Sequence, residues 1–248
     1  MTRPDAILTT LQRSDAARPR ITCYDDTASP TRGERIELSA RVLSNWVAKA
    51  ANALQEEYDI EPGSRVLLAL PPHWRTAYWA LAVWAVGGCV VLDGGEQADL
   101  CVSDDPGLID DFIAGSGAGA GAILVTLMAL AREADGEIQD GVMDEAAQLA
   151  TYPDQFAPWG EADDDDPALI VDGETIAFAD LAAWAAEDEA EALDRGARAH
   201  VSTYDTALFL KVLLRAWSCD GSVVLSRGEP TVEVLAERLV TESVTHTL

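Results

Sequence analysis

The chain has 248 residues and is 48% hydrophobic, which is enough to bury one sizeable core or two small ones. Its formal net charge is −26, with acidic residues along the whole chain and only two lysines against fifteen arginines. A surface of this charge repels nucleic-acid phosphate and anionic lipid, so neither nucleic acid nor a membrane is expected as a partner.

The sequence predicts a cytoplasmic protein. No segment reaches the roughly 18 uninterrupted apolar residues that cross a bilayer, and residues 1–15 lack the apolar core of a signal peptide. Three scattered histidines and the absence of a Cys-x-x-Cys pair argue against a metal site. Four widely spaced cysteines with apolar neighbours are expected as buried, reduced thiols: Cys23, Cys89, Cys101 and Cys219.

The acidic, lysine-poor composition bears on the salt concentration in which the protein works rather than on its substrate. Molar salt shortens the screening length to about 3 Å and so relieves repulsion among like charges. Such compositions resemble those of proteins from salt-loving organisms, and we hypothesise a hypersaline cytoplasm. The dense run at 163–166 is interpreted as a solvated linker in preference to a metal site.

The first half of the chain alternates helices with strands. Helices are expected at 7–13, from the N-cap Ser39 to near Tyr58, at 76–86 and at 108–113. Strands are expected at 20–24, 35–38, 65–70, 89–92, 100–103 and 123–126, the first two as a hairpin. The glycine-rich stretch 115–122 lacks a preceding strand and a following helix, so it is expected as a flexible loop rather than a dinucleotide fingerprint.

The second half continues the same alternation after a short helix at 143–150 and a polar linker at 153–167. Strands are expected at 168–171, 200–202, 222–225 and 244–247, and helices at 178–193, 206–217 and 232–241. The pattern predicts an α/β fold, with a mainly parallel sheet flanked by helices on both sides. We expect a single domain, 1–248, built from halves of about 1–152 and 168–248.

Two stretches carry a resemblance to a known superfamily. The first reads RIELSARVLSNWVAKAANAL and continues DIEPGSRVLLALPPHWRTAYWALAVWAVGGCVVL. The second reads ARAHVSTYDTALFLKVLLRAWSCDGSVVLSRGEPTVEVLAERLVTESVTHTL. Their order of elements resembles the amino-terminal region of the acyl-adenylate-forming enzymes, which include acyl-CoA synthetases, and a group of short proteins related to them. The resemblance implies the fold of that region.

One departure from the superfamily bears on function. The resemblance implies a Thr-, Ser- and Gly-rich ATP loop with a lysine after the strand at 168–171, but the chain there reads ALIVDGETIAFADL. Asp172 and Glu174 place negative charge where phosphate oxygens would lie. The superfamily's later motifs and its carboxy-terminal domain with the catalytic lysine have no match either. We therefore expect no catalytic residues, no cofactor and no acyl-adenylate formation by this chain alone.

Two places at the carboxyl ends of predicted strands are candidate ligand sites, because open α/β sheets bind ligands there. At the first, His73 offers an acid or base and Trp74 a stacking surface; the structural alternative is that both pack or cap the next helix. At the second, Asp172 and Gly173 are the candidate ligand-binding residues; the structural alternative is that they form a hairpin turn.

Three functions remain open from the sequence. The first is a non-catalytic relative of the adenylating enzymes that binds a small acyl or nucleotide ligand or serves as an accessory subunit. The second is one part of a split ligase, completed by a partner subunit. The third is a structural or interaction module, for which a homodimer is expected.

Overall fold

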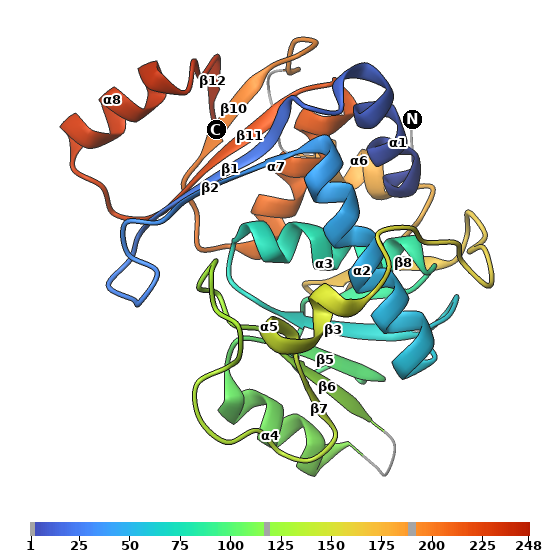
Figure 1. Ribbon diagram of the computed structural model, residues 1–248. Helices are drawn as coiled ribbons and strands as arrows, with labels where there is room; N and C mark the ends of the chain where they lie inside the picture. The colour runs from blue at the N-terminus through green and yellow to red at the C-terminus, as the bar shows by residue number, and fades with distance from the viewer. Residues whose placement is uncertain (1–2, 117–119, 188–191) are drawn as a thin grey trace. The chain divides into compact units, whose positions relative to one another are not determined.

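The computed structural model describes residues 3–116, 120–187 and 192–248 (Figure 1). The chain divides into two units that are interleaved in sequence: unit 1 is 1–44, 71–77 and 180–248, and unit 2 is 45–70 and 78–179. These bounds differ from the sequential halves expected above. The reason is that β1 (Pro19–Asp26), near the amino terminus, pairs in parallel with β11 (Ser222–Gly228), near the carboxyl terminus.

Unit 1 contains a five-stranded sheet. Its strand order is β12 (His246–Thr247), β10 (Arg198–Val201), β11, β1 and β2 (Arg35–Ser39). The hairpin pair β1–β2 is antiparallel, as the sequence predicts, and the other pairs are parallel. In the β1–β11 pair, Cys23 lies opposite Leu225 and Asp25 opposite Arg227.

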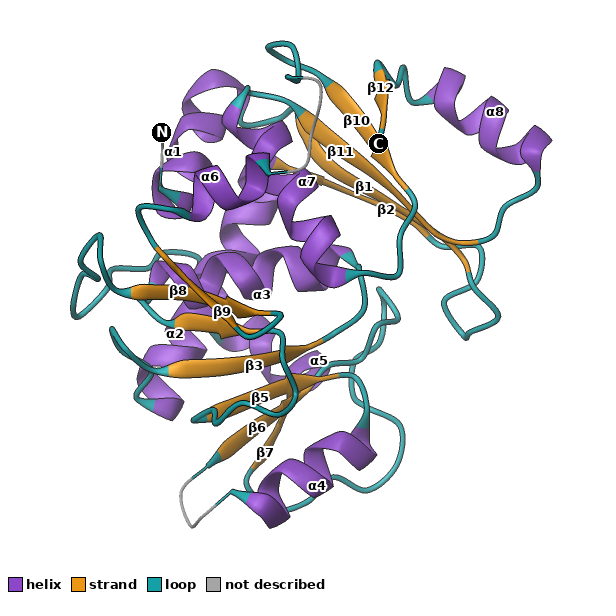
Figure 2. Ribbon diagram, turned by 180° about the vertical axis from the view of Figure 1, so that it is seen from behind, coloured by secondary structure: helices purple, strands orange, loops and turns teal. Residues whose placement is uncertain are grey.

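The two faces of the unit 1 sheet differ in chemistry. α7 (Thr206–Ser218) packs on the apolar face, where the Trp217 indole N–H donates to the Arg20 carbonyl at 3.0 Å. α1 (Pro4–Asp15) and α6 (Leu181–Ala186) pack against α7. α8 (Val232–Thr241) stands on the other face, which is polar (Figure 2). This second face carries alternate residues of the strands, including Thr22, Tyr24 and Ser226.

Unit 2 contains a seven-stranded sheet, parallel except for the last pair, β8–β9. Its order is β7 (Val142–Asp144), β6 (Gly121–Leu124), β5 (Leu100–Ser103), β3 (Arg65–Ala69), β4 (Cys89–Val91), β8 (Pro167–Val171) and β9 (Glu174–Ala177). The apolar run in β3 is buried on both faces, as expected for a central parallel strand.

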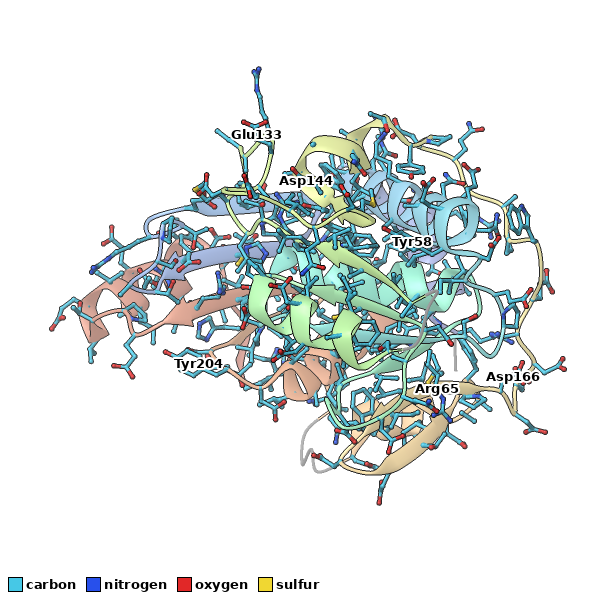
Figure 3. The ribbon with its side chains drawn as sticks, turned by 90° about the horizontal axis from the view of Figure 1, so that it is seen from below. Tyr58, Arg65, Glu133, Asp144, Asp166 and Tyr204 are labelled. Carbon is cyan, nitrogen blue, oxygen red and sulfur yellow. The ribbon has the colours of Figure 1, made fainter. Side chains whose placement is uncertain are left out.

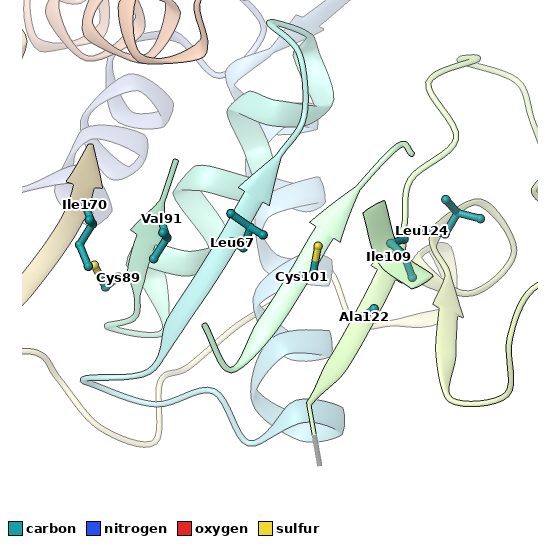
Figure 4. Packing of buried hydrophobic residues seen from close by; sticks show 8 residues of the cluster. All are labelled: Leu67, Cys89, Val91, Cys101, Ile109, Ala122, Leu124 and Ile170. Atoms are coloured by element: carbon teal, nitrogen blue, oxygen red, sulfur yellow. The ribbon is translucent and has the colours of Figure 1, made fainter. Parts of the chain in front are cut away.

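Helices cover both faces of the unit 2 sheet. α4 (Pro106–Gly115) packs on one face through Ile109, and Figure 4 shows this cluster with the neighbouring helices behind the strands. The buried members are Leu67, Cys89, Val91, Cys101, Ile109, Ala122, Leu124 and Ile170. On the other face lie α2 (Ala40–Tyr58) and α3 (Trp74–Ala85), each of which begins in unit 1 and continues into unit 2.

The predicted fold class is confirmed, since the chain is α/β with mostly parallel strands flanked by helices. It has two sheets, however, where one was expected. The expected helix at 143–150 is also partly wrong: Val142–Asp144 forms β7 beside β6, and only α5 (Glu145–Gln148) and a 3₁₀ turn (Leu149–Thr151) are helical. The Asp144 carboxylate, labelled in Figure 3, caps α5 by accepting from the Ala147 amide.

Two expectations fall partly outside the described residues. Residues 117–119 of the glycine-rich stretch and residues 188–191 of the helix expected at 178–193 are not described. Before that gap the helix α6 is short, because 178–180 form a turn that follows β9. Among the residues described, no helix is long and apolar enough to cross a membrane.

Candidate functional site

The turn between β8 and β9 is built as an anion-binding concavity. Its two residues have left-handed backbone conformations, with φ of +52° at Asp172 and +76° at Gly173. Successive residues of this kind point their backbone N–H groups to the same side, forming a nest for an anion. Glycine adopts such a conformation at no steric cost, and aspartate is among the residues that tolerate it.

The nest holds a carboxylate of the chain itself. The Asp172 N–H donates to one carboxylate oxygen of Asp93 at 2.9 Å, and the Gly173 N–H donates to the other at 2.7 Å. Asp93 reaches the turn because it follows β4, the strand next to β8, and the Leu92 N–H donates to the Ile170 carbonyl at 3.0 Å. The amides of this turn are therefore already paired with an anion.

The carboxylates of the turn itself face solvent. Asp172 and Glu174 are both exposed, and β9 forms the outer edge of the sheet. Neither lysine of the chain is free to neutralise them. Lys49 pairs with Asp154 at 2.8 Å and donates to two carbonyls, and Lys211 lies 3.8 Å from Glu187. The turn thus combines a filled nest with outward-facing negative charge.

His73 and Trp74 lie together in unit 1 at the start of α3, and they are only 2% and 3% exposed. The Arg75 N–H donates to His73 Nδ1 at 3.3 Å, so the side chain of His73 caps the helix. The ring proton must therefore be on Nε2. Burial and the nearby charges of Arg227 and Arg75 hold the pKa of His73 well below its usual value, which keeps the ring neutral at pH 7.

Trp74 is packed between its neighbours. Its ring centroid lies 5.4 Å from that of His73, and the Arg75 guanidinium stands 4.4 Å from the centre of the indole. The contact has the geometry of a cation–π interaction. His73 and Trp74 thus cap and pack against α3, which is the structural alternative named for them above. Ligand binding by His73, Trp74, Asp172 or Gly173 stays a prediction.

The structure adds polar residues that the sequence did not single out. The Asp25 carboxylate is buried and accepts hydrogen bonds from Thr27, from Thr31 at 2.6 Å and from Arg227. Burial alone would raise the pKa of Asp25, but the threonine hydrogen bonds and the Arg227 charge outweigh it and lower that pKa. Asp93 was missed as well, since its proximity to the turn follows only from the order of strands.

Cysteine and metal chemistry find little support in the described part of the chain. Burial raises the pKa of Cys23 and of Cys101 to about 12 and that of Cys89 to about 11, so these thiols are protonated at neutral pH. Cys219 is half-buried. No group of three or more His, Cys, Asp or Glu side chains among the described residues is arranged to hold a metal ion.

The chain was compared with family models and with curated proteins. No family model matches the chain. It is 34% identical over 249 residues to a protein of Mycobacterium tuberculosis described as "TIGR03089 family protein", and the match covers 98% of this chain and 96% of that protein. The two chains are thus similar over nearly their whole lengths.

Solved structures with the same fold are acyl-CoA synthetases and related ligases. An acyl-CoA synthetase from Brucella canis matches 99% of this chain with a TM-score of 0.74 and 14% identity. A variant of coronafacic acid ligase from Pectobacterium brasiliense matches 99% with a TM-score of 0.70 and 13% identity. This chain spans 47% and 50% of those two structures, about half their length. The expected likeness to acyl-adenylate-forming enzymes is therefore confirmed at the level of the fold.

Proposed function

The chain belongs to the TIGR03089 family, and on that premise we propose that it is a non-catalytic relative of AMP-dependent acyl-CoA synthetases that binds a small acyl or nucleotide ligand. One observation carries the proposal: the turn after β8 has its amide donors filled by Asp93. Phosphate sites depend on such amides being available to the ligand. A triphosphate at this turn would compete with a tethered carboxylate and meet the exposed charges of Asp172 and Glu174.

The magnitude of this repulsion is large compared with a typical hydrogen bond. Two like charges 4 Å apart repel by about 4 kcal/mol at the effective dielectric constant of a protein surface. Unit 2, to which the turn belongs, carries 3 Lys and Arg residues against 25 Asp and Glu, a formal charge of −22. Adenylation needs positioned phosphates and a stabilising positive charge in the transition state. A ligand with little negative charge suits this unit better than ATP does.

Two measurements test the proposal together. ATP–pyrophosphate exchange by the pure protein, assayed with a panel of short and aromatic carboxylic acids in 2 M KCl, should stay at the level of a protein-free control. A thermal-shift screen with AMP, CoA and the same acids should find a compound that raises the melting temperature, because a ligand that binds only the folded state stabilises it. Exchange above background would overturn the non-catalytic role. No shift with any compound would favour a structural or interaction module.

A second candidate is one part of a split acyl-adenylate-forming ligase. It is favoured by the observation that the chain spans about half the length of the solved structures with its fold. A partner subunit would then supply the phosphate-binding cation. Affinity purification at native salt, followed by mass spectrometry and an exchange assay on the recovered complex, tests this candidate. Exchange by the complex, but not by the pure chain, would support it over the first.

A further inference from the structure

The helix α8 is held on the unit 1 sheet by charged side chains at its carboxyl end, and its Leu235 and Leu239 are half-buried. Arg238 and Glu242, in and just after its last turn, are 7% and 6% exposed. Its valines point away, since Val232, Val234 and Val240 are exposed. Figure 2 shows the helix standing on one side of the sheet, joined to it by loops at both ends.

Glu242 forms one part of the attachment. Its carboxylate accepts from Tyr24 Oη at 2.5 Å and from Arg35 at 2.8 Å, and it pairs with Arg198. Burial alone would raise the pKa of Glu242, but the hydrogen bonds from Tyr24, Arg35 and Arg198 outweigh it and lower that pKa. This part of the attachment stays ionised well below neutral pH.

Arg238 forms the other part of the attachment. Its contacts lead through Ser226 to the histidine His200. Its guanidinium lies 2.9 Å from the Asp26 carboxylate, stacks 4.0 Å from the centre of the Tyr24 ring, and donates to Ser226 Oγ at 2.8 Å. Ser226 Oγ is in turn 3.0 Å from His200 Nε2. Ser226 is fully buried and His200 is 2% exposed.

The direction of each hydrogen bond in the series Arg238–Ser226–His200 follows from the donors available. A guanidinium can only donate, so Ser226 Oγ accepts from Arg238, and its single hydroxyl proton is left for His200 Nε2. This assignment gives the Ser226 hydroxyl proton an acceptor, and on it His200 is neutral, with its own proton on Nδ1. His200 Nδ1 is buried and has no hydrogen-bond partner among the residues that the structure describes.

We propose that His200, Ser226 and Arg238 form a proton-sensitive latch, which helps to hold α8 on the five-stranded sheet at neutral pH and weakens in acid, while the Glu242 contacts remain. A proton taken from solvent by His200 Nε2 turns that atom into a donor. Ser226 Oγ then faces two donors, and its hydroxyl proton loses its acceptor. The new imidazolium also lies beside the Arg238 guanidinium, which pairs with the Asp26 carboxylate of β1. The Arg198 guanidinium and the Glu242 carboxylate on the same face pair with each other.

The direction of the pH effect follows from the pKa of His200. Burial and the charge of Arg238 lower that pKa below its ordinary value. A histidine released from the latch recovers a pKa of about 6.5, so it takes up protons more readily than the docked one. The docked state is therefore fully favoured above about pH 6.5 and loses stability as the pH falls below it. The other histidine of this sheet, His246 on β12, bonds the Thr245 hydroxyl at 2.8 Å.

Hydrogen–deuterium exchange of residues 232–241 tests the latch in the full chain. After correction for intrinsic rates, the protection of α8 should fall between pH 7.5 and pH 5 by up to about thirtyfold, the bound set by a released histidine of pKa about 6.5. His200→Gln keeps a hydrogen-bond acceptor for Ser226 but does not titrate, so it should abolish most of this fall. His246→Gln, the matched control, should keep it.

Three outcomes would overturn the latch: constant protection of α8 from pH 7.5 to 5 in the unmodified protein, an undiminished fall in His200→Gln, or a loss of the fall in His246→Gln. If His200→Gln does not fold, nitrogen NMR of the unmodified protein decides the matter. It should find the His200 proton on Nδ1 at pH 7.5, and a proton on Nε2 at that pH would contradict the proposed order of hydrogen bonds.

Discussion

Asp93 is the side chain that occupies the two backbone amides of the β8–β9 turn. It places one oxygen on each of two backbone amides, so it both fills the nest and ties β4 to the turn of the neighbouring strand. A carboxylate held in the chain competes with any free anion at a high effective concentration. A free anion should therefore bind the two amides of this turn more weakly than it would without Asp93.

Asp93→Ala should lower the free energy of unfolding by about 1–2 kcal/mol, because two amides lose a charged acceptor in a half-exposed setting. Urea unfolding in 2 M KCl measures the change. Glu174→Ala is the control, since it removes an exposed carboxylate next to the same turn and should change stability by less than about 0.5 kcal/mol. Equal effects of the two substitutions would mean that the contact with the amides contributes no stability.

Asp25 provides a prediction with a defined pH dependence. Asp25→Asn leaves Arg227 buried beside a neutral group, which should cost about 3 kcal/mol at pH 7. Because the pKa of Asp25 is lowered in the folded protein, its charge contributes stability above the unfolded pKa of about 3.9, and this contribution is lost as the pH falls through the folded pKa. Urea unfolding at pH 7, 5 and 3.5 should show the gap between the two proteins narrowing only at the lowest pH. A constant gap would assign the loss to packing.

At the scale of elements, α7 depends on a capped amino terminus. The Asp205 carboxylate accepts from the Ala207 N–H at 2.8 Å and from the Leu208 N–H at 3.3 Å. Asp205→Ala should therefore cost about 1 kcal/mol. Asp180 holds the same position before α6 but makes no side-chain bond to that helix. Asp180→Ala should cost clearly less in the same urea assay, and the reverse order would contradict the capping assignment.

Elements were predictable where local signals agree. For α8 the predicted range 232–241 coincides with the observed bounds, since an apolar period follows the N-cap Thr231, which accepts from the Val234 N–H at 3.4 Å. β7 was not predictable because three residues are too few to show a period, and only pairing with β6 makes them a strand. β9 is a strand because the turn at Asp172 folds it back onto β8.

The candidate site was predictable only in part, for a related reason. The resemblance to the acyl-adenylate-forming enzymes implies that Asp172 and Gly173 stand where those enzymes have their ATP loop. The sequence does not show that Asp93, 79 residues earlier, lies against them, because this requires knowing that β4 is the neighbour of β8. The polar face beneath α8 was hidden in the same way. Arg198, Glu242 and Arg35 come from distant segments that only the strand order β10–β11–β1–β2 brings together.

At the scale of the whole molecule, the negative charge is concentrated in one unit. Unit 1 carries 14 Lys and Arg residues against 18 Asp and Glu, a formal charge of −4, whereas unit 2 carries −22. In unit 1 Arg227 pairs with the buried carboxylate of Asp25, and Arg35 and Arg198 pair with that of Glu242. In unit 2, by contrast, most acidic residues are exposed, for example Glu133 in Figure 3. Self-repulsion therefore acts mainly on unit 2.

The salt dependence of stability should follow this division. Screening lengths are about 10 Å in 0.1 M salt and about 2–3 Å in molar salt, so 2 M KCl suppresses repulsion between exposed carboxylates almost completely. The melting temperature should therefore be higher in 2 M than in 0.1 M KCl. On lowering the salt, amides of the unit 2 strands, such as β5 and β6, should lose protection from hydrogen exchange before those of β1 and β11 in unit 1. Sucrose at matched water activity is the control for general solute effects. Equal melting temperatures in 0.1 M and 2 M KCl would refute the hypersaline adaptation, and simultaneous loss of protection in both units would show that the excess charge of unit 2 does not govern it.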